Sequence, residues 1–488
     1  MNRKSVAVIG SGIGGIAAAI RLRIGGHEVS VFESNAYPGG KLSQVQQGSY
    51  RFDAGPSLFT LPHLVDELFE LAGENPRDHF NYIKLPTNCH YFYPDGTFIR
   101  AFSEKEKLIQ EITEKTHESA KNIETAINNS KFLYEKLSEL FIFSSIDRLK
   151  TFLSKSAFKA YGSIHKLGFF GTMNSANSKR FKDKRLTQLF NRYATYNGSS
   201  PFKTPATMNI IPHLEMNIGA FMPKGGMHEI TRSLYQLANR LGIQFHFNSP
   251  VTEILITRKQ IVGIKVKDQK MHFDRVVSNM DIVNTYKKLL PSLKAPDFLL
   301  NQPKSSSALI FYWGIKKTFP QLDAHNILFS DDYKTEFDHI FNQGSIYNDP
   351  TVYINITSKY ESNDAPEGSE NWFVMINVPN NKGQNWEKLK NEARASIIRK
   401  VSSMLKSDIE ELIEVEEVLD PILIEKKTSS AQGALYGNSS NNLFAAFLRH
   451  SNKSKRVKGL YFCGGSVHPG GGIPLSLSSA KLVDDLFH

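Results

Sequence analysis

The sequence predicts an α/β protein, and three of its features predict this class. A glycine-rich turn near the N-terminus lies between a short apolar strand and a helix of small residues. A second strand follows and ends at an acidic residue. At the C-terminus, another strand, a second glycine-rich loop and a closing helix complete the chain. Together these features indicate a Rossmann-like domain that is built from both ends of the chain.

The composition is that of a globular protein with more than one domain. The 488 residues are 40% hydrophobic and 22% charged, which is close to average soluble usage. The two cysteines, Cys89 and Cys463, are too few for a disulfide framework and fit no metal-ligand spacing. We therefore expect a reducing compartment and no metal site. No apolar run exceeds six residues. A membrane-spanning helix needs about 20 predominantly apolar residues, so we expect no membrane-spanning helix.

The N-terminal motif has the order and spacing of an adenine-dinucleotide site. After a strand at Val6–Ile9, Gly10 allows the tight turn. Gly12 lets the backbone approach a pyrophosphate, and Gly15 lets the helix pack closely on the strand. Glu33 ends the second strand, where a carboxylate binds the ribose of NAD or FAD. The predicted contacts of this motif are Gly10, Ser11, Gly12, Gly14, Gly15 and Glu33.

Two elements after the acidic residue point to FAD. One reads Pro38-Gly39-Gly40-Lys41 and the other reads Asp53-Ala54-Gly55-Pro56-Ser57. With them, the sequence resembles the FAD-dependent amine oxidase and carotenoid desaturase superfamily. The resemblance implies an FAD-binding domain of the glutathione reductase/amine oxidase type, in which Lys41 stands where arginine is commoner. It also implies cofactor contacts at Gly39, Gly40, Lys41, Gly55, Pro56 and Ser57.

The C-terminal segment points to the same cofactor. A strand is expected at 459–463 and a helix at 476–487, and the loop between them resembles the carotenoid desaturase signature, which implies that it passes the flavin. Ser466 stands where many flavoproteins place an aspartate that binds the ribityl chain. The loop looks more like the hydroxycarotenoid 3,4-desaturase branch than like phytoene desaturases. The implied contacts are Gly465, Ser466, Ile473, Pro474 and Leu475.

A third segment connects the two ends. Residues 223–227 open an expected helix that runs to about Leu241, and strands are expected at 244–248 and 250–254. In the superfamily that the sequence resembles, the matching valine contacts the adenine, which implies Val251 here.

These segments predict three regions. The FAD-binding domain is expected to be discontinuous and to contain residues 1–74, 223–295 and 445–488. Residues 75–222 are expected to form a helical region for membrane docking and substrate. Residues 296–444 are expected to form an inserted α+β substrate-binding domain.

The positive charge is concentrated in one segment. The chain has 59 basic and 48 acidic residues, and between Arg148 and Arg185 ten residues are basic and one is acidic. At helical periodicity, the apolar residues of 149–167 form one stripe with most lysines opposite, which suits an anionic bilayer surface. A solvated helix that packs its stripe on its own domain is the alternative. The predicted membrane contacts are Lys150, Lys155, Lys159 and Lys166.

The distribution of positive charge predicts the binding partners and the location of the protein. No nucleic-acid partner is expected, because no recognition fold accompanies the basic run at 179–185. We expect a cytoplasmic protein that is held peripherally at the inner face of the cell membrane.

The resemblance implies a lipid-dissolved carotenoid as substrate. Core packing explains most of the 33 Phe and 18 Tyr, but the resemblance favours an apolar tunnel among them. In such an enzyme a flavin accepts a hydride from an allylic C–H bond, and quinone or oxygen is the possible electron acceptor. No Ser/His/Asp, paired-Cys or metal-spaced cluster stands out, and His468 is the one candidate for a catalytic or substrate-hydroxyl contact.

The expected function is desaturation of a carotenoid, which introduces a C-3,4 double bond next to a 1-hydroxylated end. A phytoene-type multistep desaturase is the alternative within the same fold. A redox-neutral carotenoid isomerase belongs to a different reaction class. A non-enzymatic binder with a vestigial dinucleotide fold is the last alternative, and it is disfavoured because cofactor motifs are present at both ends of the chain.

Overall fold

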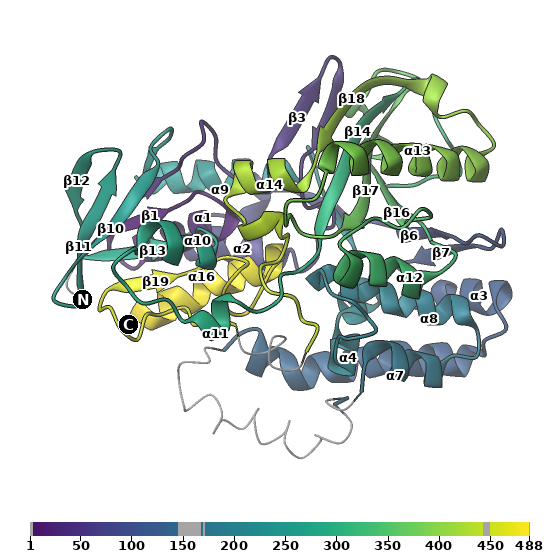
Figure 1. The fold of residues 1–488 in the computed structure, drawn as a ribbon, viewed down its shortest axis with the longest axis horizontal. Coiled ribbons are helices and arrows are strands. Elements are labelled where there is room, and N and C mark those ends of the chain that lie inside the picture. The colour runs from purple at the N-terminus through teal and green to yellow at the C-terminus, as the bar shows by residue number, and fades with distance from the viewer. Residues whose placement is uncertain (1–2, 145–166, 169–170, 443–448, 488) are drawn as a thin grey trace.

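A five-stranded parallel sheet forms one half of the protein (Figure 1). The computed structural model describes residues 3–144, 167–168, 171–442 and 449–487. The strand order is β19-β13-β1-β2-β9, and every neighbouring pair is parallel. The strands are β1 (Ser5–Ile9), β2 (Glu28–Phe32), β9 (Gln244–His246), β13 (Arg275–Ser278) and β19 (Leu460–Phe462). This parallel sheet confirms the predicted α/β class.

Three helices pack together on this sheet: α1 (Ile13–Ile24), α9 (His228–Arg240) and α16 (Ile473–Phe487). Helix α1 is buried along Ile16–Leu22, where small alanines allow close contact with its neighbours. Helix α16 begins three residues before the predicted start at Ser476. Its second residue is Pro474, which lacks an N–H group and is tolerated in the first turn of a helix.

A seven-stranded mixed sheet forms the other half. Its order is β18-β14-β17-β16-β15-β6-β7, and all pairs are antiparallel except β15 with β6. The strands are β6 (Thr87–Phe92), β7 (Phe98–Phe102), β14 (Ser307–Ile315), β15 (His325–Leu328), β16 (Val352–Ile356), β17 (Glu370–Val378) and β18 (Ile413–Leu419). Helix α13 (Trp386–Leu405) packs on one face through a core that contains Trp313 and Trp372.

The region expected to be helical, 75–222, differs from that expectation in one respect. It contributes β6 and β7 to the second sheet. Strand β6 pairs with β15 from the following region, and β7 pairs with β6. Its helices are α3 (Lys105–Lys115), α4 (Ala120–Phe141), α7 (Met173–Arg180) and α8 (Lys184–Asn191), which lie along the lower side in Figure 1. The division of the chain into three regions stays a prediction.

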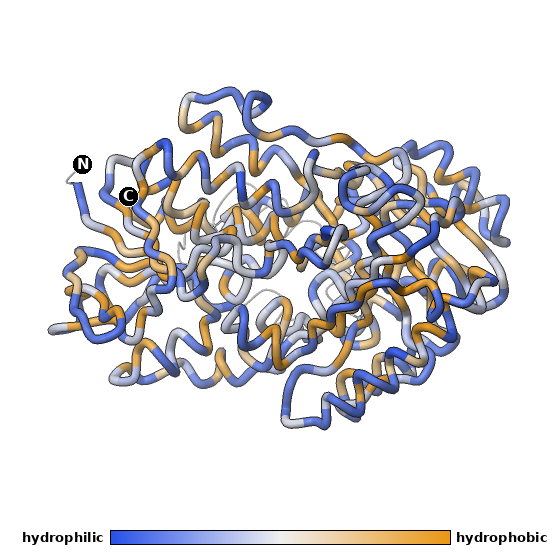
Figure 2. Tube along the Cα trace, turned by 90° about the horizontal axis from the view of Figure 1, so that it is seen from above, coloured by the Kyte–Doolittle hydropathy of each residue, from blue (hydrophilic) through white to orange (hydrophobic). Residues whose placement is uncertain are grey.

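The predicted docking helix is not part of this description, because Lys150, Lys155, Lys159 and Lys166 lie outside the described residues. Among the helices that are described, none is long and apolar enough to span a membrane. Figure 2 shows hydrophobic stretches through the interior of both halves and hydrophilic turns around the outside.

Shorter elements complete the fold. The remaining strands are β3 (Gln44–Gln47), β4 (Tyr50–Asp53), β5 (Tyr82–Lys84), β8 (Phe221–Pro223), β10 (Val251–Thr257), β11 (Gln260–Val266) and β12 (Gln269–His272). The remaining α-helices are α2 (His63–Leu71), α10 (Ile282–Asn284), α11 (Asp297–Leu300), α12 (Tyr333–Asp338) and α14 (Pro421–Thr428).

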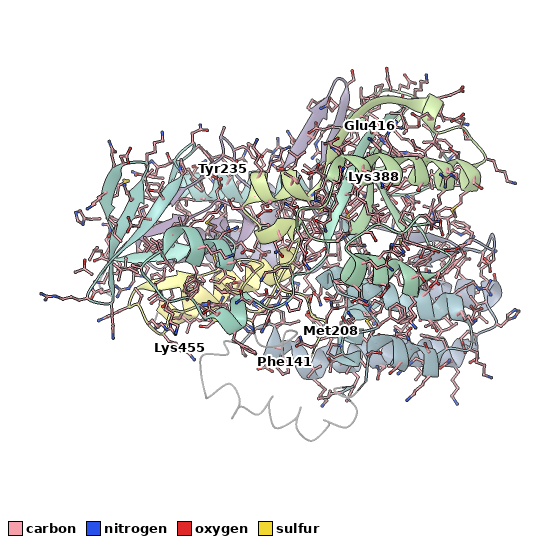
Figure 3. All side chains as sticks on the ribbon, in the orientation of Figure 1. Phe141, Met208, Tyr235, Lys388, Glu416 and Lys455 are labelled. Carbon is pink, nitrogen blue, oxygen red and sulfur yellow. The ribbon has the colours of Figure 1, made fainter. Side chains whose placement is uncertain are left out.

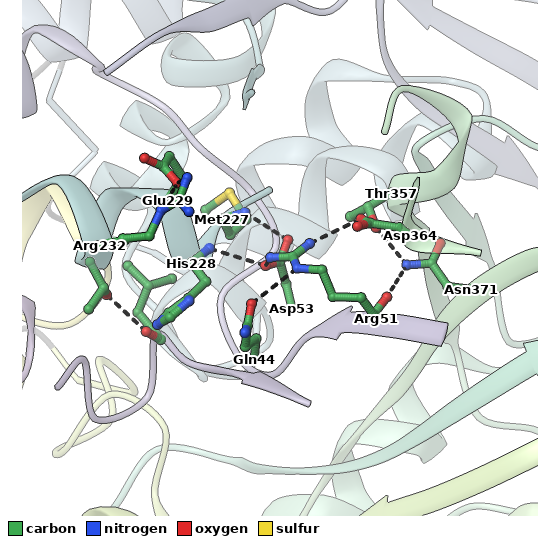
Figure 4. A network of polar contacts seen from close by, with 12 residues as sticks. Gln44, Arg51, Asp53, Met227, His228, Glu229, Arg232, Thr357, Asp364 and Asn371 are labelled. Atoms are coloured by element: carbon green, nitrogen blue, oxygen red, sulfur yellow. Dashed lines mark hydrogen bonds and ion pairs between the residues drawn. The ribbon is translucent and has the colours of Figure 1, made fainter. Parts of the chain in front are cut away.

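A buried polar network joins the two halves (Figure 4). Asp53, at the end of β4, accepts the backbone N–H groups of Met227 at 2.7 Å and His228 at 3.1 Å, where α9 begins. Arg51 donates to Asp53 at 2.6 Å and to Asp364 at 3.0 Å. Burial raises the pKa of Asp53, and the charge of Arg51 opposes that effect. The network therefore caps α9 and fixes β4 against the second half.

Gly15 provides a test of how tightly α1 packs on β1. A Cβ atom at Gly15 would lie 2.1 Å from the carbonyl oxygen of Gly10, a contact that the backbone can relieve only by moving. Gly15→Ala is therefore expected to lower the free energy of unfolding by about 1–3 kcal/mol, as overpacking of a buried site does. Urea unfolding followed by circular dichroism measures this loss.

The matched control is Gly25→Ala at the other end of the same helix. Gly25 has a φ of −66°, and its nearest atoms would lie 3.4 Å from a new Cβ. This variant should stay within about 0.5 kcal/mol of the parent protein. Equal losses in the two variants would show that the close approach at Gly15 is not the determinant.

Candidate cofactor and substrate site

One large cavity connects the two halves of the protein. Its volume is about 990 Å³. It is lined by the loops that follow the parallel strands β1, β2, β13 and β19, and by side chains from β14 to β17 of the second sheet. In parallel α/β sheets ligands bind at the carboxyl ends of the strands, and this cavity lies at that edge.

The glycine turn after β1 forms one wall with room for a close ligand. Gly12 is the N-cap of α1 and makes no side-chain capping bond, so the first turn presents N–H groups and a partial positive charge. The side chain of Asn279, after β13, lies against this turn. A Cβ at Gly12 or Gly14 would come within 2.9 Å of the Asn279 carboxamide, so a side chain at either position would displace Asn279.

Glu33 is held at the end of β2 beside the same turn. Its Oε2 accepts both the backbone N–H and the hydroxyl of Ser11, each at 2.8 Å. Its Oε1 accepts the N–H of Asn35 at 2.9 Å. Glu33 is 5% exposed and lines the cavity. This is the position from which a carboxylate can bind a ribose diol.

Lys41 brings a buried positive charge to this wall. Its Nζ donates to the carbonyl oxygens of Leu435 at 2.7 Å and Ala434 at 3.2 Å. Burial lowers the pKa of Lys41 to about 8, and the nearby charge of Asp281 opposes that effect. A bound anion such as a pyrophosphate would stabilise the protonated form. Gly40 places Lys41 close to the turn, since a Cβ there would lie 3.5 Å from Cα of Gly12.

The C-terminal loop forms the facing wall. Ser466 Oγ accepts the N–H of Ile282 at 2.9 Å, which leaves its own proton free to donate. All predicted cofactor residues line the cavity except Ser11 and Gly15, which lie behind the turn. The lining set is Gly10, Gly12, Gly14, Glu33, Gly39, Gly40, Lys41, Gly55, Pro56, Ser57, Val251, Gly465, Ser466, Ile473, Pro474 and Leu475. Their individual contacts with a cofactor stay predictions.

His468 lies in the same loop, where it lines the cavity and is buried. Its Nε2 is 2.9 Å from the carbonyl oxygen of Ser144, at the end of the segment that follows α4. A carbonyl only accepts, so this nitrogen carries the proton and donates it to the backbone. The arrangement connects the loop to the α4 segment, and the predicted catalytic role of His468 stays a prediction.

A buried charged cluster in the cavity wall escaped the sequence analysis. Glu215 accepts from Arg192 at 2.6 Å and from the hydroxyls of Tyr193 at 3.0 Å and Tyr91 at 3.2 Å. The hydroxyl of Tyr196 also donates to Glu215. Burial opposes ionisation of Glu215, but the charge of Arg192 and the hydrogen bonds outweigh it and lower the pKa, so the carboxylate is charged and fully engaged. Nε of Arg192 has no hydrogen-bond partner among the described residues. These residues carry no motif, and no signal in the sequence brings them together.

The rest of the substrate side of the cavity is largely apolar. Phe141 and Met208, labelled beside α4 in Figure 3, both line it. Further apolar lining comes from Leu137, Ile142, Ile210, Ile211, Leu214, Ala308, Ile310, Ile327, Phe337, Phe373 and Met375. A chamber of this kind buries a hydrocarbon and excludes water.

Comparison with known proteins identifies the family. The model of the flavin-containing amine oxidoreductases matches residues 13–483. This chain belongs to that family. It is an FAD-dependent oxidoreductase, and the predicted resemblance to the amine oxidase and carotenoid desaturase superfamily is confirmed. The glycine turn, Glu33 and Lys41 fit FAD, since they offer N–H groups, a carboxylate and a cation at one sheet edge.

Several proteins of known sequence or structure are similar to this chain. A 1-hydroxycarotenoid 3,4-desaturase from Flavobacterium sp. (strain P99-3) is 53% identical, over 99% of both chains. A phytoene desaturase from Fusarium fujikuroi is 30% identical, over 99% of this chain and 88% of its own. The crystal structure of an oxidoreductase from Methanosarcina mazei covers 98% of this chain and 99% of its own, with a TM-score of 0.65 and 15% identity. This last similarity concerns the fold alone.

The charge of Lys41 predicts a pH dependence of FAD binding. Without ligand, Lys41 loses its proton as the pH rises through about 8. The protonated form binds a pyrophosphate more tightly, so FAD affinity is expected to be full below this pH. Above it, affinity should fall by up to about tenfold per pH unit. Titration of the apoprotein with FAD, followed by flavin fluorescence from pH 6.5 to 9.5, measures the change.

Lys41→Arg is the control for this prediction. A guanidinium stays protonated throughout this pH range, so the variant should bind FAD with a flat pH profile. A flat profile in the parent protein, or the same slope in both proteins, would contradict the role of Lys41.

Proposed function

We propose that this protein is a carotenoid desaturase that introduces a C-3,4 double bond next to a 1-hydroxylated end. The observation that carries the proposal is the 53% identity to a 1-hydroxycarotenoid 3,4-desaturase over 99% of both chains. The phytoene desaturase relative is more distant, at 30% identity. A multistep phytoene-type desaturase is therefore the second candidate.

The cavity supports this substrate class. The cofactor wall and the apolar chamber belong to one cavity of about 990 Å³, so a polyene in the chamber would reach the FAD-binding elements. The charged groups Arg192 and Glu215 pair with each other, so they do not disfavour a hydrocarbon beside them.

The chemistry divides between cofactor and chain. When bound, FAD supplies a hydride acceptor, so that the carotenoid loses one hydride and one proton and a new C=C bond forms. The first turn of α1 and Lys41 would hold the pyrophosphate, and Glu33 would bind the ribose. The apolar wall orients the polyene and excludes water. His468 positions this wall through its bond to Ser144. Quinone or oxygen is the proposed final electron acceptor.

We also propose that the protein takes its substrate from the inner face of the cell membrane. Phe141 and Ile142, which line the cavity, lie just before the predicted docking segment. On α11, Phe298 is 80% exposed, as a residue that inserts into a bilayer surface would be. Lysines close to an anionic surface add about 1 kcal/mol each to binding.

Product analysis tests the proposed reaction. FAD-loaded protein in liposomes, with an electron acceptor, is given a 1-hydroxylated carotenoid and, separately, phytoene. Conversion of only the hydroxylated substrate is expected, with a loss of two hydrogens by mass and a red-shifted absorption, because conjugation is extended. Conversion of phytoene would favour the phytoene-type candidate. An unchanged mass with a changed spectrum would show an isomerase.

Liposome flotation tests the membrane proposal. Replacing Lys150, Lys155, Lys159 and Lys166 by glutamate should reduce binding to anionic vesicles by more than about tenfold, because four attractions become repulsions. The control replaces four exposed lysines elsewhere, Lys316, Lys317, Lys382 and Lys388, in the same way. Equal binding by the two variants would assign the attraction to net charge and not to the predicted segment.

A further inference from the structure

One histidine of the cavity wall has a ring nitrogen that forms no hydrogen bond with the described part of the chain. His325 begins β15, lines the cavity and is 3% exposed. Its Nδ1 lies 2.8 Å from the hydroxyl of Tyr353 and 3.2 Å from Nδ2 of Asn355. Its Nε2 is buried and has no hydrogen-bond partner among the residues that the structure describes.

The hydrogen bonds around Nδ1 determine the tautomer. Asn355 Nδ2 also donates to the carbonyl oxygen of Ala324 at 2.7 Å, so this atom is the amide nitrogen. It therefore donates to His325, and Nδ1 is an acceptor. Burial lowers the pKa of His325 to about 4, which keeps the ring neutral at physiological pH. The single ring proton then lies on Nε2, which is an unsatisfied N–H donor.

An unsatisfied buried donor has a cost that a ligand can remove. A buried polar group without a hydrogen bond destabilises the protein, because it has lost its contacts with water and gained none in return. Glu215 is engaged, since it accepts from Arg192 and from three tyrosines. Among the described lining residues, Nε of Arg192 and Oγ1 of Thr207 also lack a hydrogen-bond partner, so a second observation must single out His325 as the donor for a ligand oxygen.

The position of His325 relative to the cofactor wall indicates which part of a ligand would reach Nε2. The Tyr353 hydroxyl that contacts His325 also lies 2.8 Å from Ser57 Oγ. Ser57 belongs to the Gly55–Ser57 element that lines the cofactor part of the cavity. Two hydrogen bonds thus connect His325 to the cofactor wall, which distinguishes it from the other unpartnered groups of the chamber.

We propose that Nε2–H of His325 donates a hydrogen bond to the 1-hydroxyl oxygen of the carotenoid and so selects hydroxylated substrates. This inference rests on the proposed function. In a 3,4-desaturation, the reacting C3 is two bonds from C1, which carries the hydroxyl. The group that recognises the hydroxyl must then lie beside the reacting bond, where the Ser57–Tyr353–His325 connection places this imidazole.

The test compares two substrates and three variants. FAD-loaded enzyme in liposomes is assayed with a 1-hydroxylated carotenoid and with the same polyene without the hydroxyl, and kcat/KM is measured for each. His325→Leu should lower kcat/KM for the hydroxylated substrate by about tenfold, the value of one hydrogen bond. It should leave kcat/KM for the other substrate unchanged, so the preference for the hydroxyl is lost.

Two polar variants separate the donor from the mere presence of a polar side chain. The amide nitrogen of glutamine reaches the position of Nε2, whereas that of asparagine reaches only the position of Nδ1. His325→Gln should keep most of the preference for the hydroxylated substrate, and His325→Asn should lose it. His213→Leu removes another buried imidazole that does not line the cavity, and it should keep the preference.

The outcomes distinguish this inference from the proposed function. Wild-type conversion of neither carotenoid overturns both. Wild-type preference for the hydroxylated substrate that persists in His325→Leu and His325→Asn, with FAD content unchanged, overturns only the role of His325. An equal fall of kcat/KM on both substrates in all three variants assigns His325 a structural role and also overturns the inference.

Discussion

The carboxamide of Asn279 occupies a space on which the whole cofactor site depends. A Cβ at Gly12, Gly14 or Gly464 would come within 2.5 to 2.9 Å of this side chain. Because β13 lies between β1 and β19 with parallel pairing, the loops after these strands meet at one edge of the sheet. The glycines let Asn279 lie between the first and last segments of the chain there, at the edge where parallel α/β sheets bind their ligands.

The substrate side of the cavity depends on a different constraint, because its apolar wall contains charged groups that must be paired. Arg192 and Glu215 form a buried ion pair that three tyrosine hydroxyls complete. The carboxylate of Glu215 is thereby fully engaged, whereas Nε of Arg192 has no hydrogen-bond partner among the described residues. Because the two charges neutralise each other, this wall can contain them and still bind a hydrocarbon. Nε2 of His325, which also has no partner among the described residues and is connected through Tyr353 to Ser57, is the group that we propose distinguishes one end of a polyene.

The element at 53–57 shows how one motif serves three functions. Its glycine, proline and serine line the cavity, as the family resemblance implies. Asp53 does not, because its carboxylate accepts the first N–H groups of α9 and pairs with Arg51. Ser57 also reaches Tyr353 in the second sheet. The same short stretch thus holds the cofactor wall, caps a helix and connects the two halves.

The sequence by itself determined the parallel strands, the glycine turn, Glu33 and the C-terminal loop, because these features depend on local pattern and short spacing. It also determined the family, which the comparisons confirm. Only the tertiary structure decided which side chains share the substrate chamber. Glu215 and Arg192 lie on a different segment from His325, and Ser57 and Tyr353 are 296 positions apart. The contact between these residues depends on the register of the second sheet, because that register brings distant segments together. Such pairing leaves no local signal in the sequence.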